Sequence, residues 1–178
     1  MTIEEIFSNL RAHMLEGTMM HDKMASAYSF LNLRGYHKNQ IHHYLEEIES
    51  YRNLQDFYLD LYHKLIPEKK IEEKQIFSTS WYKYTREDVD VNTKRSAIKD
   101  LMQKWINWEK ETKKLYETSY KQLFELGEMR AAAKLMELIN DVSEELIEAN
   151  NIYINLETVN YDIVYIIDKQ DVGDDKDD

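Results

Sequence analysis

Side chains that could bind a metal ion fall on the apolar faces of successive helical segments. His21 lies on a stripe that steps by three or four residues, and Glu47 and Glu109 fall on the inner faces of the next two segments. A fourth candidate, Glu145, lies at the edge of the stripe in the last segment. Carboxylates and imidazole inside a helical bundle are the ligands of di-iron and di-manganese sites. The sequence therefore indicates a candidate site for iron or manganese.

A structural role explains the same residues without a metal, and it is our main interpretation. The usual bundle site contains Glu-x-x-His on two helices, whereas here Glu47 is followed by Ser50 and the last segment contains no histidine. A buried glutamate can instead be satisfied by a tyrosine hydroxyl or an arginine. The spacing of His43 and Glu47 predicts a contact on the helix surface. The sequence presents no activated nucleophile, and we assign no catalytic residue.

Four helical segments must position these side chains. The apolar periodicity predicts helices from Ile3 to Leu33, from Lys38 to Leu65, from about Asn92 to Leu126, and beyond Gly127 to about Leu156. The pattern predicts two antiparallel hairpins with a long connection between the second and third helices, long enough to run the length of a bundle.

Residues typical of helix caps and helix breaks mark the ends of these segments. Thr2 and Glu5 form a capping-box pattern at the start of the first helix. We expect Gly35 and Gly127 to supply left-handed caps at the two tight turns. Pro67 is expected to stop the second helix.

Composition sets the fold class and excludes several functions. One proline and four glycines among 178 residues favour an all-α domain over a sandwich or barrel. A net charge of -11 disfavours nucleic acid as a partner, and no apolar run is long enough to span a membrane. The cysteine-free sequence and an N-terminus unlike a signal peptide lead us to expect a cytoplasmic protein. We expect one bundle domain over residues 1–167 and an acidic, disordered tail over residues 168–178.

The first hairpin resembles Dps proteins, the mini-ferritins of the ferritin-like superfamily. The likeness rests on Phe30-Leu31-Asn32-Leu33-Arg34-Gly35, on Ile41-His42 and on Glu46-Glu47, and the segment from Ala132 to Tyr153 resembles the family's last helix. The resemblance implies a ferritin-like four-helix bundle.

The same resemblance implies a ferroxidase site that has been dismantled. His42 matches the second iron-binding histidine of the family, whereas Phe30 stands where the first would be. The later acidic positions fall near Phe57 and Leu61, which cannot bind iron.

Two function classes follow from the residues and the resemblance together. The main one is a ferritin-like, non-catalytic structural or interaction protein of unknown partner. The alternative is a ferritin-like metal-binding protein with an iron or manganese carboxylate site in the bundle core, acting in iron storage or oxidation. The aromatic run from Trp81 to Tyr84 supplies spare apolar surface and predicts self-association as a homodimer.

Overall fold

The chain folds into four long α-helices. The computed structural model describes residues 1–71, 76, 84–162 and 166. These residues form α1 (Ile3–Phe30), α2 (Arg34–Tyr62), α3 (Val91–Glu125) and α4 (Met129–Thr158), with the short 3-10 helix η2 (Arg86–Asp88) before α3. No strand occurs in the part of the chain that is described. The all-α fold class is confirmed.

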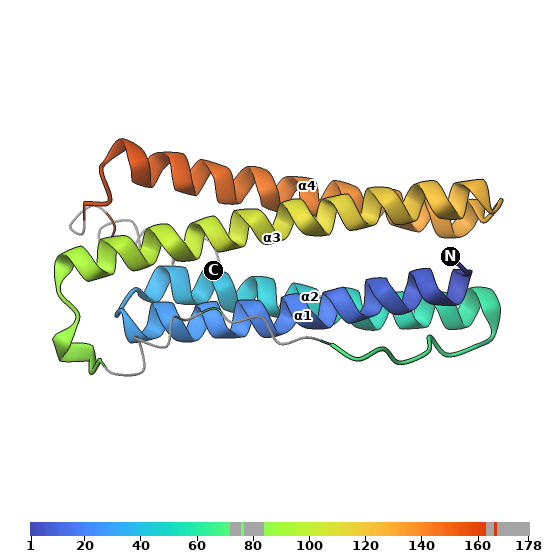
Figure 1. Ribbon diagram of the computed structural model, residues 1–178, viewed down its shortest axis with the longest axis horizontal. Coiled ribbons are helices and arrows are strands. Elements are labelled where there is room, and N and C mark those ends of the chain that lie inside the picture. Colours follow the sequence, from blue (N-terminus) through green and yellow to red (C-terminus); the bar gives the residue numbers. More distant parts are fainter. Residues whose placement is uncertain (72–75, 77–83, 163–165, 167–178) are drawn as a thin grey trace, which may run out of the picture.

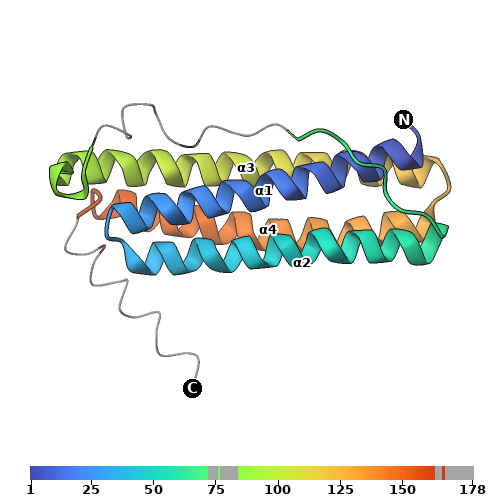
Figure 2. The ribbon, with the colours of Figure 1, turned by 90° about the horizontal axis from the view of Figure 1, so that it is seen from below.

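The helices pair as two antiparallel hairpins (Figure 1). The hairpin of α1 and α2 lies against the hairpin of α3 and α4, with α1 beside α3. Seen from below, α2 lies beside α4 (Figure 2). Because α2 ends and α3 begins at opposite ends of the bundle, their connection spans its length, and the expected long crossover is confirmed.

The first hairpin turn uses a different residue from the one the sequence suggested. The prediction that Gly35 caps the first helix is wrong, since Gly35 lies in the first turn of α2. Asn32 takes the left-handed conformation instead, with φ of 58°. Backbone N–H groups of Asn32 and Leu33 donate to the carbonyls of Ser29 and Tyr28, which makes a Schellman cap. Asparagine tolerates this conformation better than most residues with a Cβ.

Other helix ends follow the sequence more closely. Thr2 and Glu5 form the expected capping box. Gly127 has φ of 79° and closes the second hairpin, as predicted. The prediction that Pro67 stops the second helix is wrong. The helix α2 ends at Tyr62, and His63 terminates it in the left-handed conformation.

The apolar core is divided into two clusters by a polar layer. Along α1 the division falls between Met14 and Met20, which belong to different clusters. Along α3 it falls between Trp108 and Tyr116. Buried polar residues therefore gather near the middle of the bundle, where side chains from all four helices can meet.

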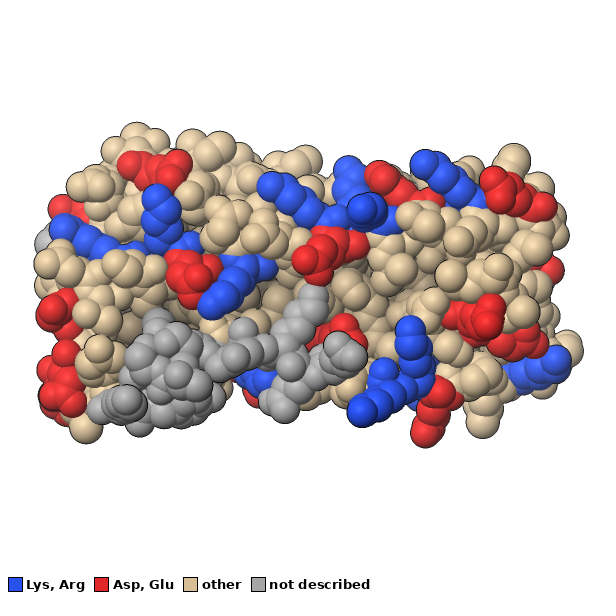
Figure 3. Space-filling view, viewed as in Figure 1, with Lys and Arg blue, Asp and Glu red and all other residues tan. Residues whose placement is uncertain are grey.

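Charges of both signs are interspersed on the face seen in Figure 3, so this face shows no continuous basic patch. The expected acidic tail at residues 168–178 lies outside the described residues, as do residues 81–83 of the aromatic run. The boundary of the bundle domain at residue 167 stays a prediction.

Candidate metal centre in the bundle core

His21 and Glu109 face each other across the bundle core. His21 is fully buried, and Glu109 is 1 % exposed. His21 Nε2 lies 3.7 Å from Glu109 Oε1, and neither atom makes a hydrogen bond in the described structure. Burial lowers the pKa of His21 to about 3, and burial raises the pKa of Glu109 well above its usual value. At neutral pH this contact is therefore not an ion pair, because both groups favour their uncharged forms.

The tautomer of His21 is set from its other nitrogen. His21 Nδ1 lies 2.9 Å from Gln40 Oε1. Gln40 Nε2 donates to Asn39 Oδ1 at 3.3 Å, which orients the amide so that its oxygen faces the imidazole. Nδ1 then carries the proton, and Nε2 keeps a lone pair directed toward Glu109. This is the arrangement that a metal-binding histidine uses.

Glu47 directs its carboxylate into the core through space left by a glycine. A Cβ atom at Gly17 would lie 2.7 Å from Glu47 Oε1 and 3.1 Å from Trp108 Cζ2. Glu47 is partly exposed as a residue, but its carboxyl end lies against these buried neighbours. Burial raises its pKa well above the usual value, and the Glu145 and Glu46 carboxylates add to the shift.

Glu145 completes an acidic cluster that draws on three helices. Its side chain is 27 % exposed. Burial, together with the nearby Glu46 and Glu148, raises the pKa of Glu145 to about 8. Glu145 and Glu47 both raise the pKa of Glu109. No lysine or arginine is among the groups that shift these three carboxyl groups within the described structure.

The four residues singled out from the sequence therefore lie in one region, one from each helix. What the cluster lacks is a finished ligand set: among the described residues, no three histidine, aspartate or glutamate side chains are arranged to hold one ion as they stand. Two ligands that each lie about 2.1 Å from one ion are separated by roughly 3 to 4 Å. The 3.7 Å between His21 Nε2 and Glu109 Oε1 falls in that range. Both atoms are also without a hydrogen-bond partner, so their chemistry fits a cation.

His43 lies in the interior of the bundle and not on the helix surface, where the sequence placed it. The prediction of a surface contact with Glu47 is wrong, since His43 is only 3 % exposed and its ring packs against Trp105, 4.8 Å between centroids. The signal was present, because Gln40, His43 and Glu47 are spaced by three and four residues. The tyrosines of α2 indicated an inner face that included Glu47 but left His43 at its edge.

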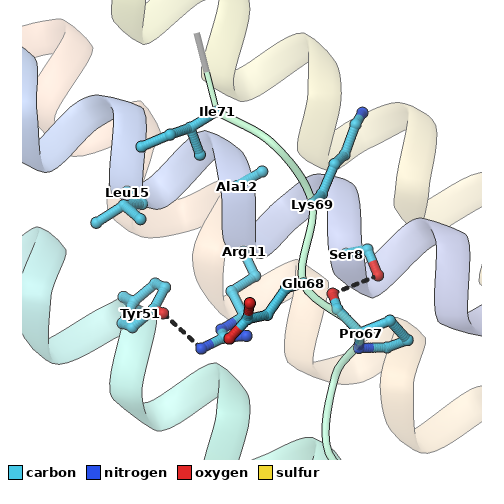
Figure 4. A pocket seen from close by; sticks show the side chains of 9 residues that line it. All are labelled: Ser8, Arg11, Ala12, Leu15, Tyr51, Pro67, Glu68, Lys69 and Ile71. Carbon is cyan, nitrogen blue, oxygen red and sulfur yellow. Dashed lines mark hydrogen bonds between the residues drawn. The ribbon is translucent and has the colours of Figure 1, made fainter. Parts of the chain in front are cut away.

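A separate hollow lies on the outside of the bundle, where residues 67–71 cross α1 (Figure 4). It has a volume of about 250 Å³. Arg11 donates to Tyr51 Oη at 2.5 Å and to the Ile66 carbonyl at 3.4 Å, and Ser8 Oγ donates to the Pro67 carbonyl at 2.9 Å. The bonds to the Ile66 and Pro67 carbonyls dock the crossing segment onto α1, and the hollow shares no lining residue with the buried cluster.

Comparison with solved structures identifies the fold. The chain matches no protein-family model and no curated protein. A humanized archaeal ferritin superposes with a TM-score of 0.78 at 12 % identity, covering 94 % of this chain and 92 % of that one. An open-pore ferritin from Archaeoglobus fulgidus gives 0.78 at 12 % identity, covering 94 % and 91 %. Apo-ferritin from Pseudo-nitzschia multiseries gives 0.73 at 12 % identity, covering 95 % and 96 %.

The protein thus has the ferritin-like four-helix fold over nearly its whole length. Identities this low show the fold alone, and the chemistry must be argued from the residues. In the described part of the chain, no helix has the length and hydrophobicity of a membrane span.

Proposed function

We propose that this protein is a ferritin-like metal-binding protein that holds a divalent transition-metal ion in the bundle core. His21, Glu47, Glu109 and Glu145 would supply the ligands. The observation that carries the proposal is the meeting of these side chains from four helices, with no lysine or arginine of the described residues among the groups that shift the pKa values of the three carboxyl groups. Buried carboxylates that repel each other are satisfied either by protons or by a cation.

Iron and manganese are the ions to test first. Carboxylate oxygens with one imidazole suit both metals. Variants of a ferritin named PmFTN, among the structures that share this fold, were soaked in iron. We confine the proposal to binding, since the described ligand atoms are not arranged as a finished site and support no reaction step.

Elemental analysis tests the proposal directly. Protein purified without chelator, then reloaded anaerobically with Fe²⁺ or Mn²⁺, is expected to retain about one ion per chain. Glu109→Gln and Glu47→Ala should each abolish that retention. Glu111→Gln is the matched control on α3, since Glu111 is exposed, and it should leave the metal content unchanged.

A second candidate function is the non-catalytic structural or interaction role. The raised pKa values of Glu47, Glu109 and Glu145 favour it, because protonated carboxyl groups need no cation. If the reloaded wild-type protein retains no metal, the metal proposal is rejected. Glu47→Ala would then change only the free energy of unfolding.

A closer relationship to Dps proteins is also proposed, and it rests on the first hairpin from Phe30 to Glu47. His42, the match to a family iron ligand, is 68 % exposed and lies 3.2 Å from Glu46 Oε1. We further propose a cytoplasmic location, on the cysteine-free sequence.

We propose self-association as a dimer. Large apolar side chains stay exposed on α2 and α4: Leu45 is 56 %, Ile147 61 % and Ile154 57 % exposed. Light scattering at micromolar concentration should give twice the chain mass of 21.5 kDa. A monomer mass would reject the proposal, and the mass of a closed shell would favour Dps-like assembly over a dimer.

A further inference from the structure

His43 is a buried side chain that is not among the proposed ligands of the core site. It lies on α2 where that helix faces α4, and it is 3 % exposed. Neither ring nitrogen makes a hydrogen bond in the described structure. A neutral imidazole offers one donor and one acceptor, and leaving both unsatisfied in a buried position costs stability. Such an orphaned side chain needs an explanation.

Carboxylate oxygens surround both nitrogens of this imidazole. Nδ1 lies 3.3 Å from Glu46 Oε2 and 3.7 Å from Glu145 Oε2, and Nε2 lies 3.9 Å from Glu148 Oε1. The two separations at Nδ1 are those of ligand pairs sharing one ion, roughly 3 to 4 Å. Trp105 packs against the ring. His43 is thus enclosed by tryptophan and carboxylates.

The surrounding glutamates lie close to solvent, and neither hydrogen bonds nor ion pairs join them to a lysine or arginine among the residues that the structure describes. Glu46 is 48 % exposed and Glu148 is 46 % exposed. In the described part of the chain, their polar contacts are with histidines and with Asn39, which donates to Glu148 Oε1 at 2.9 Å. His42 Nε2 adds a further nitrogen 3.2 Å from Glu46 Oε1. The negative charge is therefore concentrated beside two imidazoles.

We propose that His43 Nδ1, Glu46 and Glu145 form a second cation site at the boundary of α2 and α4, for an imidazole-binding transition-metal ion such as Zn²⁺. Glu148 lies at the other ring nitrogen and borders this site on the solvent side. Imidazole selects zinc-like ions over magnesium and calcium, which prefer oxygen ligands alone. The site does not depend on metal binding in the core. Glu145 belongs to both candidate ligand sets, so a change at Glu145 would not separate the two sites, whereas changes at Glu46 and Glu109 do.

The present side-chain positions need a small adjustment to bind an ion. The described residues form no complete ligand set as they stand. Glu46 is half exposed, so its carboxylate can rotate toward an ion on His43 Nδ1 without disturbing the packed core. A neutral imidazole keeps a lone pair on one ring nitrogen, and that nitrogen can bind the ion.

Zinc titration of tag-free protein, by competition with a chromogenic chelator at pH 7, tests this site. Glu46→Gln and His43→Gln should each weaken zinc binding at least tenfold, and Glu148→Gln should weaken it less. Glu49→Gln on α2 and Glu144→Gln on α4 are matched controls, because both residues are exposed and neither contacts His43; they should change affinity less than twofold. Excess magnesium should not displace the zinc.

Glu46→Gln keeps the test informative if His43→Gln fails to fold, since Glu46 is half exposed. The proposal is overturned if Glu46→Gln binds zinc as tightly as Glu49→Gln does. It is equally overturned if the wild-type protein binds no zinc, or if Glu109→Gln removes all zinc binding. None of these results decides whether iron or manganese binds in the core. Elemental analysis of Glu109→Gln decides that question.

Discussion

The carboxylate of Glu47 occupies the space that a side chain at position 17 would need. A Cβ on Gly17 would lie 2.7 Å from Glu47 Oε1. Because glycine in a helix interior costs about 1 kcal/mol relative to alanine, its presence in the middle of α1 needs a compensating benefit. That benefit is the close approach of an acidic group from α2 to the core of the bundle.

Replacing Gly17 by alanine should therefore displace Glu47. The gain in helix propensity, about 1 kcal/mol, is opposed by overpacking of about 1–3 kcal/mol. Trp108 Cζ2, 3.1 Å from the added Cβ, belongs to a buried ring that cannot move freely. We expect a net loss of about 1 kcal/mol, measured by urea unfolding, and weaker metal retention if the core site binds metal.

A double-mutant cycle isolates the contact. In the Glu47→Ala background the closest clash is absent, so Gly17→Ala should cost at least about 1 kcal/mol less than it does in the wild type. Equal costs in the two backgrounds would show that Glu47 does not occupy the space beside Gly17.

The buried carboxyl groups make the metal-free protein sensitive to alkaline pH. Glu145 has a folded pKa of about 8, raised by burial and by Glu46, Glu148 and Asp141, against about 4.5 when unfolded. A raised carboxyl pKa contributes stability below about pH 4.5 that is lost as the pH rises through 8. His21 and His43, with lowered pKa values, are neutral in both states above about pH 7.

The pH range in which both histidines stay neutral while Glu145 titrates is therefore about pH 7 to 8.5. Chelator-treated protein should lose about 1–2 kcal/mol there for each carboxyl group that is still protonated, and thermal unfolding would show it as a falling Tm. Glu145→Gln should flatten the curve. Glu144→Gln, at an exposed neighbouring position, should leave the slope unchanged. A Tm that rises with pH across this window would contradict the assigned pKa shift.

The sequence predicted the fold and the burial of two core side chains well, because helical periodicity reports which face of a helix is buried. His21 and Glu109 lie on strongly apolar stripes, and both are buried as expected. Periodicity failed at His43, because the inner face of α2 is polar along this part and the tyrosines of that helix suggested a face with His43 at its edge. Nor could it show that the carboxylate of Glu47 lies against Gly17, since that contact depends on the rotation of two helices about their axes.

The prediction of the first turn was also wrong, and it leads to a test. Asn32, with φ of 58°, caps α1, whereas Gly35 lies within α2. Asparagine and glycine compete for this role, and spacing alone did not choose between them. Asn32→Ala should destabilise the protein by about 1 kcal/mol, Asn32→Gly should be close to neutral, and Gly35→Ala should not be destabilising. Chemical denaturation of the three variants checks the order, and a larger loss for Gly35→Ala than for Asn32→Ala would reverse the assignment.

The contact between Gln40 and His21 predicts which tautomer the buried imidazole adopts. With Nδ1–H donating to Gln40 Oε1 at 2.9 Å, the lone pair on Nε2 faces Glu109. Gln40→Leu removes the acceptor, so the ring should switch to the Nε2–H tautomer and donate toward Glu109 Oε1. The orphaned polar group should cost about 1–3 kcal/mol. Nitrogen-15 NMR of the imidazole distinguishes the two tautomers directly.

Gln103→Leu is the matched control for this last change, because Gln103 is exposed on α3 and bonds only to Asn107 in the described structure. It should alter neither the imidazole spectrum nor the free energy of unfolding by more than about 0.5 kcal/mol. Under the core-metal proposal, Gln40→Leu should also weaken metal retention, because Nε2 would carry a proton where the ion needs a lone pair. A wild-type spectrum that shows the Nε2–H tautomer would contradict the assigned orientation of Gln40 and remove His21 Nε2 from the ligand set of the resting protein.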